Sequence, residues 1–263
     1  MRQPAAIGFY PGDKIALRNE LKKFLVHNAK KYKAIGAIVP HAGYMYSGKV
    51  AGITYSSIET DKRTFMIFCP NHTGYGSRIA LSQENWITPL GIVKTKRFLK
   101  LEIDENAHLY EHAIEVQLPF LQTLYKDFDI IPVCLSHLSL REIEELSKRL
   151  VDENLFYIAS SDFTHFGHMY NYIPINKSDK ENLEYVENID KKAIELICSI
   201  EPEKFYNFVV KNNMTICGFI PITLLLFITR QLDAKEGKLI KYSTSYEVSK
   251  GSSFVSYAGI LIV

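Results

Sequence analysis

Two histidines follow apolar runs of the chain at equivalent points, where each run ends in a short polar loop. His41 lies in the segment PHAGY and His72 in the segment PNHTG. Because ligands bind beyond the carboxyl ends of the strands in an open α/β sheet, we expect the two imidazoles to meet at one edge. Two imidazoles and one anionic ligand, with open positions, are typical of a non-haem iron site.

The residues offer two candidates for the anionic ligand and do not rank them. Cys217 precedes an apolar helical segment, where the helix dipole and a nearby cation favour a thiolate. Asp162 lies in the loop SSDFTHFG after another apolar run. His165 is three residues further on, close enough to share a proton with Asp162 or to orient it, so this pair is a candidate for acid-base chemistry.

A second group of charged residues falls on the helix predicted over residues 111–125. His112 and Glu115 are three residues apart and so share one face, and Glu111 and Glu115 form an acidic i,i+4 pair. The H-E-x-x-H spacing of many zinc proteases is absent, so that chemistry is not indicated. We interpret the remaining histidines as surface or capping residues: His27, His108, His137 and His168.

Short apolar runs alternate with helical periodicity along most of the chain. Strands are expected at 34–39, 64–69, 129–135 and 155–159, and helices near 13–25, 111–125, 140–151, 183–200, 202–211 and from 217 onward. The runs at 239–248 and 253–263 resemble an antiparallel hairpin. The pattern predicts an α/β fold: one domain over residues 1–263, with a layered, mainly parallel sheet, antiparallel carboxyl-terminal strands and flanking helices.

Composition excludes several classes of protein. A net charge of +2 with mixed signs gives no electrostatic footprint for nucleic acid or an anionic membrane. The most apolar stretch, 219–228, is shorter than a membrane span and is interpreted as a buried helix. The four cysteines lack C-x-x-C spacing and are expected to be reduced thiols. No signal-peptide pattern opens the sequence, which favours a cytoplasmic location.

Several longer motifs make the chain similar to a known family. They are RQPA at 2–5, GFYP at 8–11, PHAGYMYSG at 40–48, PNH at 70–72, EH at 111–112, EVQLPFLQ at 115–122, SSDFTH at 160–165 and CG at 217–218. Together they resemble the Memo family, which includes AmmeMemoRadiSam system protein B. The resemblance extends from end to end and implies a fold like that of LigB-type class III extradiol dioxygenases.

The same resemblance implies a site and a function. It implies a metal pocket made by His41, His72 and Cys217, with Asp162, His165 and His112 as the candidate catalytic groups. We expect an iron-dependent, dioxygenase-like oxidoreductase that uses Fe(II), with Cu or Zn as alternative metals because thiolate suits them. The alternatives are a non-catalytic module that binds a partner or peptide, and a copper- or iron-buffering protein. Family association suggests AMMECR1-like and radical-SAM proteins as partners.

Overall fold

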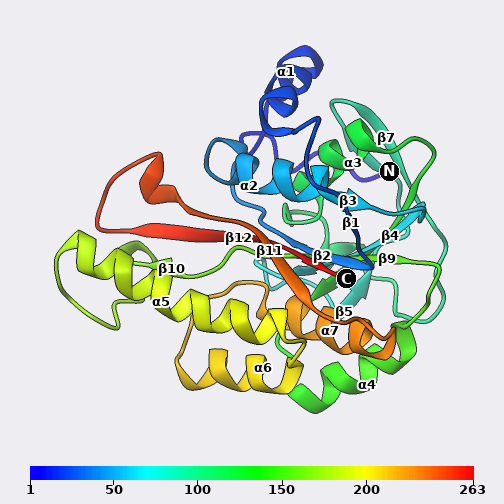
Figure 1. Ribbon diagram of the computed structural model, residues 1–263. Helices are drawn as coiled ribbons and strands as arrows, with labels where there is room; N and C mark the ends of the chain where they lie inside the picture. Colours follow the sequence, from blue (N-terminus) through cyan, green and yellow to red (C-terminus); the bar gives the residue numbers. More distant parts are fainter.

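A ten-stranded mixed sheet forms the centre of the structure, a computed structural model that describes residues 1–263 (Figure 1). In spatial order its strands are β10 (His165–Phe166), β12 (Phe254–Ile262), β2 (Gly36–Val39), β9 (Phe156–Ser160), β4 (Thr64–Pro70), β8 (Asp129–Leu135), β7 (Gly91–Thr95) and β6 (Trp86–Thr88). Two further strands, β11 (Gly237–Thr244) and β5 (Ile79–Leu81), pair antiparallel with β12 and β8. A separate parallel pair joins β1 (Tyr32–Lys33) and β3 (Ile58–Glu59).

The sheet is parallel in its middle and antiparallel toward both sides. Strands β2, β9, β4, β8 and β7 run parallel to one another, whereas β12 is antiparallel to β2 and β6 is antiparallel to β7. The carboxyl ends of β2, β9 and β4 therefore lie at one edge, where the loops with His41, Asp162 and His72 begin. The predicted α/β class, with antiparallel carboxyl-terminal strands, is confirmed.

Helices cover both faces of the sheet and give the molecule three layers (Figure 1). One face packs against α1 (Lys14–Phe24), α2 (Tyr44–Ser56) and α3 (Leu118–Leu124). The other packs against α4 (Leu140–Leu150), α5 (Asp179–Cys198), α6 (Pro202–Lys211) and α7 (Phe219–Gln231). In β4, Phe65 and Ile67 point to the first group of helices and Met66 and Phe68 to the second. Both faces are buried, which explains the continuous apolar runs.

The helix predicted over residues 111–125 is wrong in its first half. Regular helix begins only at Leu118, after a 3-10 turn at Glu115–Gln117. Pro119 lacks the N–H that would continue a longer helix through this point. His112 and Glu115 therefore do not share a helix face but belong to an irregular segment ahead of α3.

The other helices and strands that were predicted are found near their expected positions. The predicted hairpin is formed by β11 and β12, and helix α7 contains the apolar stretch 219–228. His27, His137 and His168 are exposed as expected, but His108 is completely buried, because its ring lies against Trp86 and reaches the Ala80 carbonyl oxygen. The expectation of a surface position for His108 was wrong.

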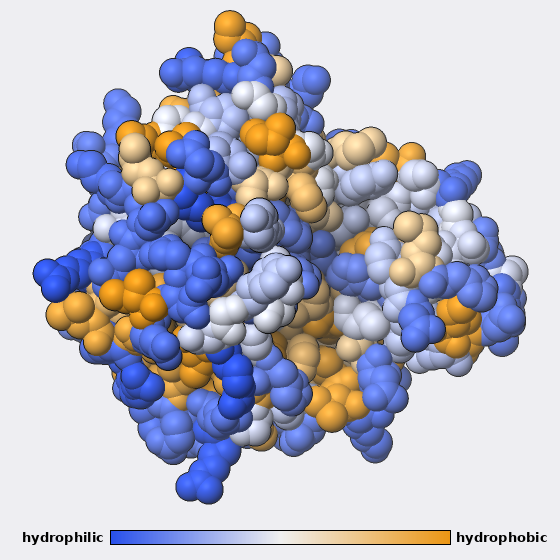
Figure 2. All heavy atoms as spheres, turned by 180° about the vertical axis from the view of Figure 1, so that it is seen from behind, coloured by the Kyte–Doolittle hydropathy of each residue, from blue (hydrophilic) through white to orange (hydrophobic).

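The surface is mixed in character. Seen from behind, it is largely hydrophilic, with hydrophobic residues in small separate groups (Figure 2). Scattered exposed apolar residues of this kind are ordinary for a folded protein. No helix combines the length and the apolar composition that crossing a membrane would need.

Candidate metal centre

Three imidazoles converge at the carboxyl edge of the parallel strands. His41 follows β2, His72 follows β4, and His112 comes from the irregular segment before α3. One ring nitrogen from each residue lies within 4.8 Å of the others. The ring centroids of His41 and His72 are 5.1 Å apart, and those of His72 and His112 are 5.0 Å apart. The predicted meeting of His41 and His72 is confirmed, and His112 joins them.

Hydrogen bonds fix which nitrogen of His41 can bind a metal. Gln117 Nε2 donates to the Pro40 carbonyl oxygen at 3.0 Å and to Ser160 Oγ at 2.8 Å. The Ser160 hydroxyl in turn donates to the Ala113 carbonyl oxygen at 2.7 Å. Ser160 Oγ has no second proton, so it must accept its 3.0 Å hydrogen bond from His41 Nδ1–H. Nε2 of His41 is therefore the nitrogen available to a metal.

A buried carboxylate orients the other two histidines. Glu111 Oε1 and Oε2 lie 3.0 and 3.2 Å from His72 Nδ1, and Oε1 lies 3.3 Å from His112 Nδ1. The same carboxylate accepts backbone N–H bonds from His72 and Ala113. An outer carboxylate that holds Nδ1–H leaves Nε2 free for a metal and raises its basicity. Glu111 is thus shared between two of the three imidazoles.

Cys217 brings a sulfur atom to the same cluster. Its Sγ lies 3.2 Å from His41 Nε2 and 3.6 Å from the Asp162 carbonyl oxygen. The neighbouring Gly218 makes this approach possible, because a Cβ there would lie 2.5 Å from Ser161 Cβ. The backbone N–H of Gly218 also donates to Ser161 Oγ, which ties the start of α7 to the loop after β9.

Asp162 lies beside the cluster, with its two carboxylate oxygens in different roles. Oδ1 accepts the backbone N–H bonds of His41 at 2.8 Å and Ala42 at 3.2 Å. Oδ2 lies 3.9 Å from His41 Nε2. The Cys217 sulfur is therefore closer to His41 Nε2 than this carboxylate is, although both lie near the same nitrogen.

Charges in the cluster are strongly coupled. Burial opposes the thiolate of Cys217, but the charge and hydrogen bond of His41 outweigh it and lower the pKa of the thiol to about 5. Burial also opposes a charged His72, yet hydrogen bonds to Cys217 and Glu111 raise its pKa to about 10. The pKa of Glu111 falls to about 2 because its bonds to His72 outweigh burial. Without a metal, the site is a thiolate and a carboxylate paired with imidazolium.

His112 differs from its neighbours in charge. Burial and the nearby charge of His41 lower its pKa to about 4, so its ring is neutral at pH 7. Phe9 stacks on the ring at a centroid distance of 4.2 Å. The side chains of His72 and His112 are 33% and 20% exposed, whereas that of His41 is 2% exposed. A ligand would therefore enter past His72 and His112.

His165 makes no ring contact or hydrogen bond with the three histidines. Its Nδ1 lies 2.9 Å from the Phe163 carbonyl oxygen and 3.0 Å from that of Thr215, and its ring packs against Tyr170. Because both carbonyls can only accept, Nδ1 carries a proton and Nε2 is left as an acceptor. Thr215 is two residues from Cys217, so the backbone around the cluster is continuous with that around His165.

Sequence reasoning missed three residues that orient the cluster: Glu111, Ser160 and Gln117. Glu111, Gln117 and Ser160 entered only as members of an acidic pair or of the motifs EH, EVQLPFLQ and SSDFTH, without an orienting role. Those roles rest on contacts between segments far apart in the sequence: Glu111 contacts His72, and Gln117 contacts Ser160, which contacts His41.

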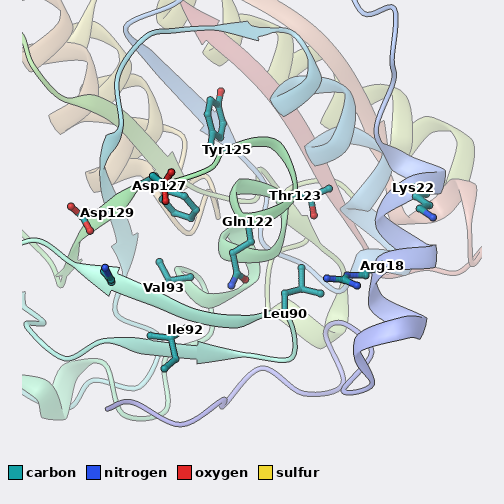
Figure 3. A pocket seen from close by; sticks show the side chains of 12 residues that line it. Arg18, Lys22, Leu90, Ile92, Val93, Gln122, Thr123, Tyr125, Asp127 and Asp129 are labelled. Atoms are coloured by element: carbon teal, nitrogen blue, oxygen red, sulfur yellow. The ribbon is translucent and has the colours of Figure 1, made fainter.

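A hollow of about 670 Å³ lies elsewhere (Figure 3). Arg18 and Lys22 of α1 form one wall, and Val93 of β7 and Asp129 at the start of β8 form another. Since β8 runs parallel to β4, this hollow is at the amino edge of the sheet, opposite the histidine cluster. It plays no part in the candidate site.

The donors in the cluster fit a transition metal. Imidazole suits iron, copper and zinc, thiolate suits the softer of these ions, and Nδ1 of each of the three imidazoles lies against an outer partner, Ser160 or Glu111. Fold and site together define an α/β protein with a group of histidines that could hold a metal ion at the carboxyl edge of its sheet.

The chain belongs to the Memo family. The family described as Memo-like protein matches residues 2–261. Similar curated relatives bear the name MEMO1 family protein. That of Methanosarcina mazei is 38% identical and covers 100% of this chain and 99% of its own length. That of Methanococcoides burtonii is 38% identical with 100% of both chains covered. That of Thermococcus onnurineus is 36% identical with 99% of both covered.

Proposed function

We propose that this protein binds Fe(II) at the histidine cluster and carries out oxidoreductase chemistry of the dioxygenase-like class. The observation that carries the proposal is the convergence of three imidazoles with the sulfur of Cys217. His41, His72 and Cys217 would hold the metal, and His112 offers a further neutral imidazole on the exposed side. Cu and Zn are the alternative metals, because the sulfur donor suits them as well.

A bound iron ion would supply Lewis-acid and one-electron chemistry, and the protein side chains would manage protons and orientation. Asp162 Oδ2 lies near His41 Nε2 and can accept a proton, while Oδ1 remains tied to the backbone. His165 has an acceptor nitrogen because its Nδ1–H is committed to two carbonyl oxygens. His72 and Glu111 keep a fixed geometry through their paired hydrogen bonds.

Metal analysis of four proteins tests the first half of the proposal. Wild type, His41→Ala, Cys217→Ser and the control His137→Ala are purified anaerobically without a metal-binding tag, and iron, copper and zinc are measured by mass spectrometry. We expect one iron or copper per chain in wild type and in the control, whose substituted histidine is exposed. Both site variants should lose the metal. If wild-type protein binds none of Fe(II), Cu(I) and Zn(II) when they are added, metal binding is refuted.

Oxygen consumption tests the second half. The iron-loaded protein is incubated with a reductant or a catechol and followed with an oxygen electrode. Consumption that depends on His41 supports an oxidoreductase, and its absence with every reductant and catechol tested refutes that activity.

A copper- or iron-buffering role is the second candidate, favoured by the low pKa of Cys217. It predicts tight Cu(I) binding without turnover, lost in Cys217→Ser, and unchanged Cu(I) affinity in that variant rejects it. If wild type binds no metal, the remaining proposal is a module that docks a peptide or an AMMECR1-like or radical-SAM partner. Retention of such a partner on immobilised wild type and His41→Ala alike would support that proposal.

A further inference from the structure

One irregular segment, residues 108–117, orients all three imidazoles of the cluster. It contributes His112 itself, and its Glu111 carboxylate holds Nδ1 of His72. It also fixes Ser160, and through it His41, by way of the Ala113 carbonyl oxygen and the Gln117 side chain. Only its last three residues form a short helical turn, so backbone hydrogen bonds alone do not define its shape.

The side chain that holds this segment is that of Arg2, more than one hundred residues earlier in the sequence. Arg2 Nε donates to the His108 carbonyl oxygen at 2.8 Å, and Nη2 donates to that of Glu111 at 2.6 Å. Nη1 forms an ion pair with Glu115 at 2.6 Å. The guanidinium lies 3.9 Å from the centre of the Trp86 ring. All three guanidinium nitrogens are therefore used, and each contacts a different point of the segment.

Glu115 is as fully engaged as Arg2. Its Oε2 accepts bonds from Arg2 and from the backbone N–H of Ala5. Its Oε1 accepts bonds from the backbone N–H of Ala6 and from the Tyr10 hydroxyl. The Arg2 and Glu115 side chains are only 3% and 0% exposed. The segment and the first ten residues are thus joined by a buried, fully satisfied ion pair.

We propose that Arg2 is a positioning residue for the metal centre. It fixes the carbonyl groups on both sides of residues 109–110 and so sets the location of the Glu111 carboxylate, which orients His72 and His112. The effect on metal binding rests on the proposed function, whereas the ordering of the segment does not. Only a planar guanidinium reaches three acceptors in fixed directions, and a lysine ammonium in its place keeps the charge but loses this geometry.

Cobalt binding tests the proposal with a metal whose spectrum reports on its ligands. Co(II) is titrated into metal-free wild type, Arg2→Lys and Arg230→Lys, and the visible spectrum and the dissociation constant are recorded. Arg230 is the matched control, because it makes a two-nitrogen contact with Glu203 on the exposed surface. We expect Arg2→Lys to bind Co(II) 10- to 100-fold more weakly, with an altered spectrum, as for loss of other outer partners. Arg230→Lys should match wild type.

Two measurements keep the test decisive if Arg2→Lys folds poorly or wild type binds no metal. Tyr10→Phe removes one of the four bonds to Glu115 with little change in volume, and we expect it to weaken Co(II) binding several-fold. Amide hydrogen exchange in the metal-free proteins follows the N–H groups of His72 and Ala113, which donate to Glu111. These should exchange faster in both variants, whereas the Leu146 amide in α4 should not.

The outcomes of these experiments distinguish the positioning role of Arg2 from the proposed metal binding. Equal Co(II) affinity and spectra in wild type and both variants, or unchanged exchange at His72 and Ala113, overturn the positioning role of Arg2. If wild-type protein binds no Co(II) while these amides exchange faster in the two variants, the ordering role of Arg2 is supported and its effect on metal binding is refuted.

Discussion

Replacing Glu111 by glutamine should weaken metal binding sharply while leaving the fold intact. The carboxylate accepts backbone N–H bonds from His72 at one oxygen and from Ala113 at the other, together with the Nδ1–H of His72. A glutamine has only one acceptor oxygen. The NH2 group of the glutamine must therefore face at least one N–H donor. A buried hydrogen bond is then lost and the His72 ring is misaligned.

In the metal-free protein the pKa of Glu111 is about 2 against an ordinary 4.5, which shows how strongly its surroundings favour the charged carboxylate. At about 1.4 kcal/mol per pKa unit, the folded environment favours the carboxylate by about 3 kcal/mol. Loss of an outer partner of a metal-bound histidine costs 10- to 100-fold in affinity, equivalent to about 1.4 to 2.8 kcal/mol. We therefore expect Glu111→Gln to raise the metal dissociation constant by that factor.

The assay is competition with a chelator of known affinity at pH 7, with circular dichroism as a check of the fold. Glu142→Gln is the control. The pKa of Glu142 is also about 2, because Ser139 and then Arg78 hydrogen-bond its carboxylate, but it lies on the exposed start of α4. The control should bind metal like wild type. A Glu111→Gln protein that is folded and binds within threefold of wild type refutes the shared-carboxylate account.

Three further predictions concern charge and packing. In metal-free protein, alkylation of Cys217 by iodoacetamide should reach half its maximal rate near pH 5. In His41→Ala the midpoint should move to clearly higher pH, because His41 supplies the largest effects that lower the pKa of the thiol; equal profiles contradict the coupling. Burial raises the pKa of Asp190 to about 6. The protonated carboxyl group therefore stabilises the folded state below about pH 4, and this stabilisation is lost as the pH rises to 6. The free energy of unfolding in urea should fall by up to about 3 kcal/mol over this range relative to Asp190→Asn, and parallel slopes would disprove it. Gly259→Ala should lower the free energy of unfolding in urea by about 1–3 kcal/mol, because the added methyl group would overlap α2. The control Gly251→Ala, whose added methyl group has open space, should not lower it; equal values for the two variants would argue against that packing.

The sequence predicts those parts of the fold whose burial produces a recognisable pattern of apolar residues. Strand β8 occupies the predicted range 129–135, because both faces are buried and its apolar run is continuous. Helix α2 leaves no such mark, since buried residues occur around much of its circumference. Strands β5 to β7 have only three to five residues each, too few for a period to show.

The candidate site likewise contains residues that the sequence predicts and residues that it does not. His41 and His72 can be predicted because each follows a strand and the topology brings strand ends together. Glu111 cannot, because its role depends on how an irregular segment folds back on the loop after β4. The burial of His108 is likewise a tertiary effect, set by its contact with Trp86 and the bond to Ala80.

The position of β12 has a consequence for when the histidine cluster can form. This strand lies inside the sheet, where Ile260 pairs with Ile38 in β2. Contacts between residues so distant in sequence carry a large loop-closure cost and slow the folding of a domain. During translation, β2 cannot be flanked by its final neighbour until residues 254–262 have left the ribosome. We therefore expect the loop with His41 to settle late, and metal loading to follow synthesis of the sheet rather than accompany it.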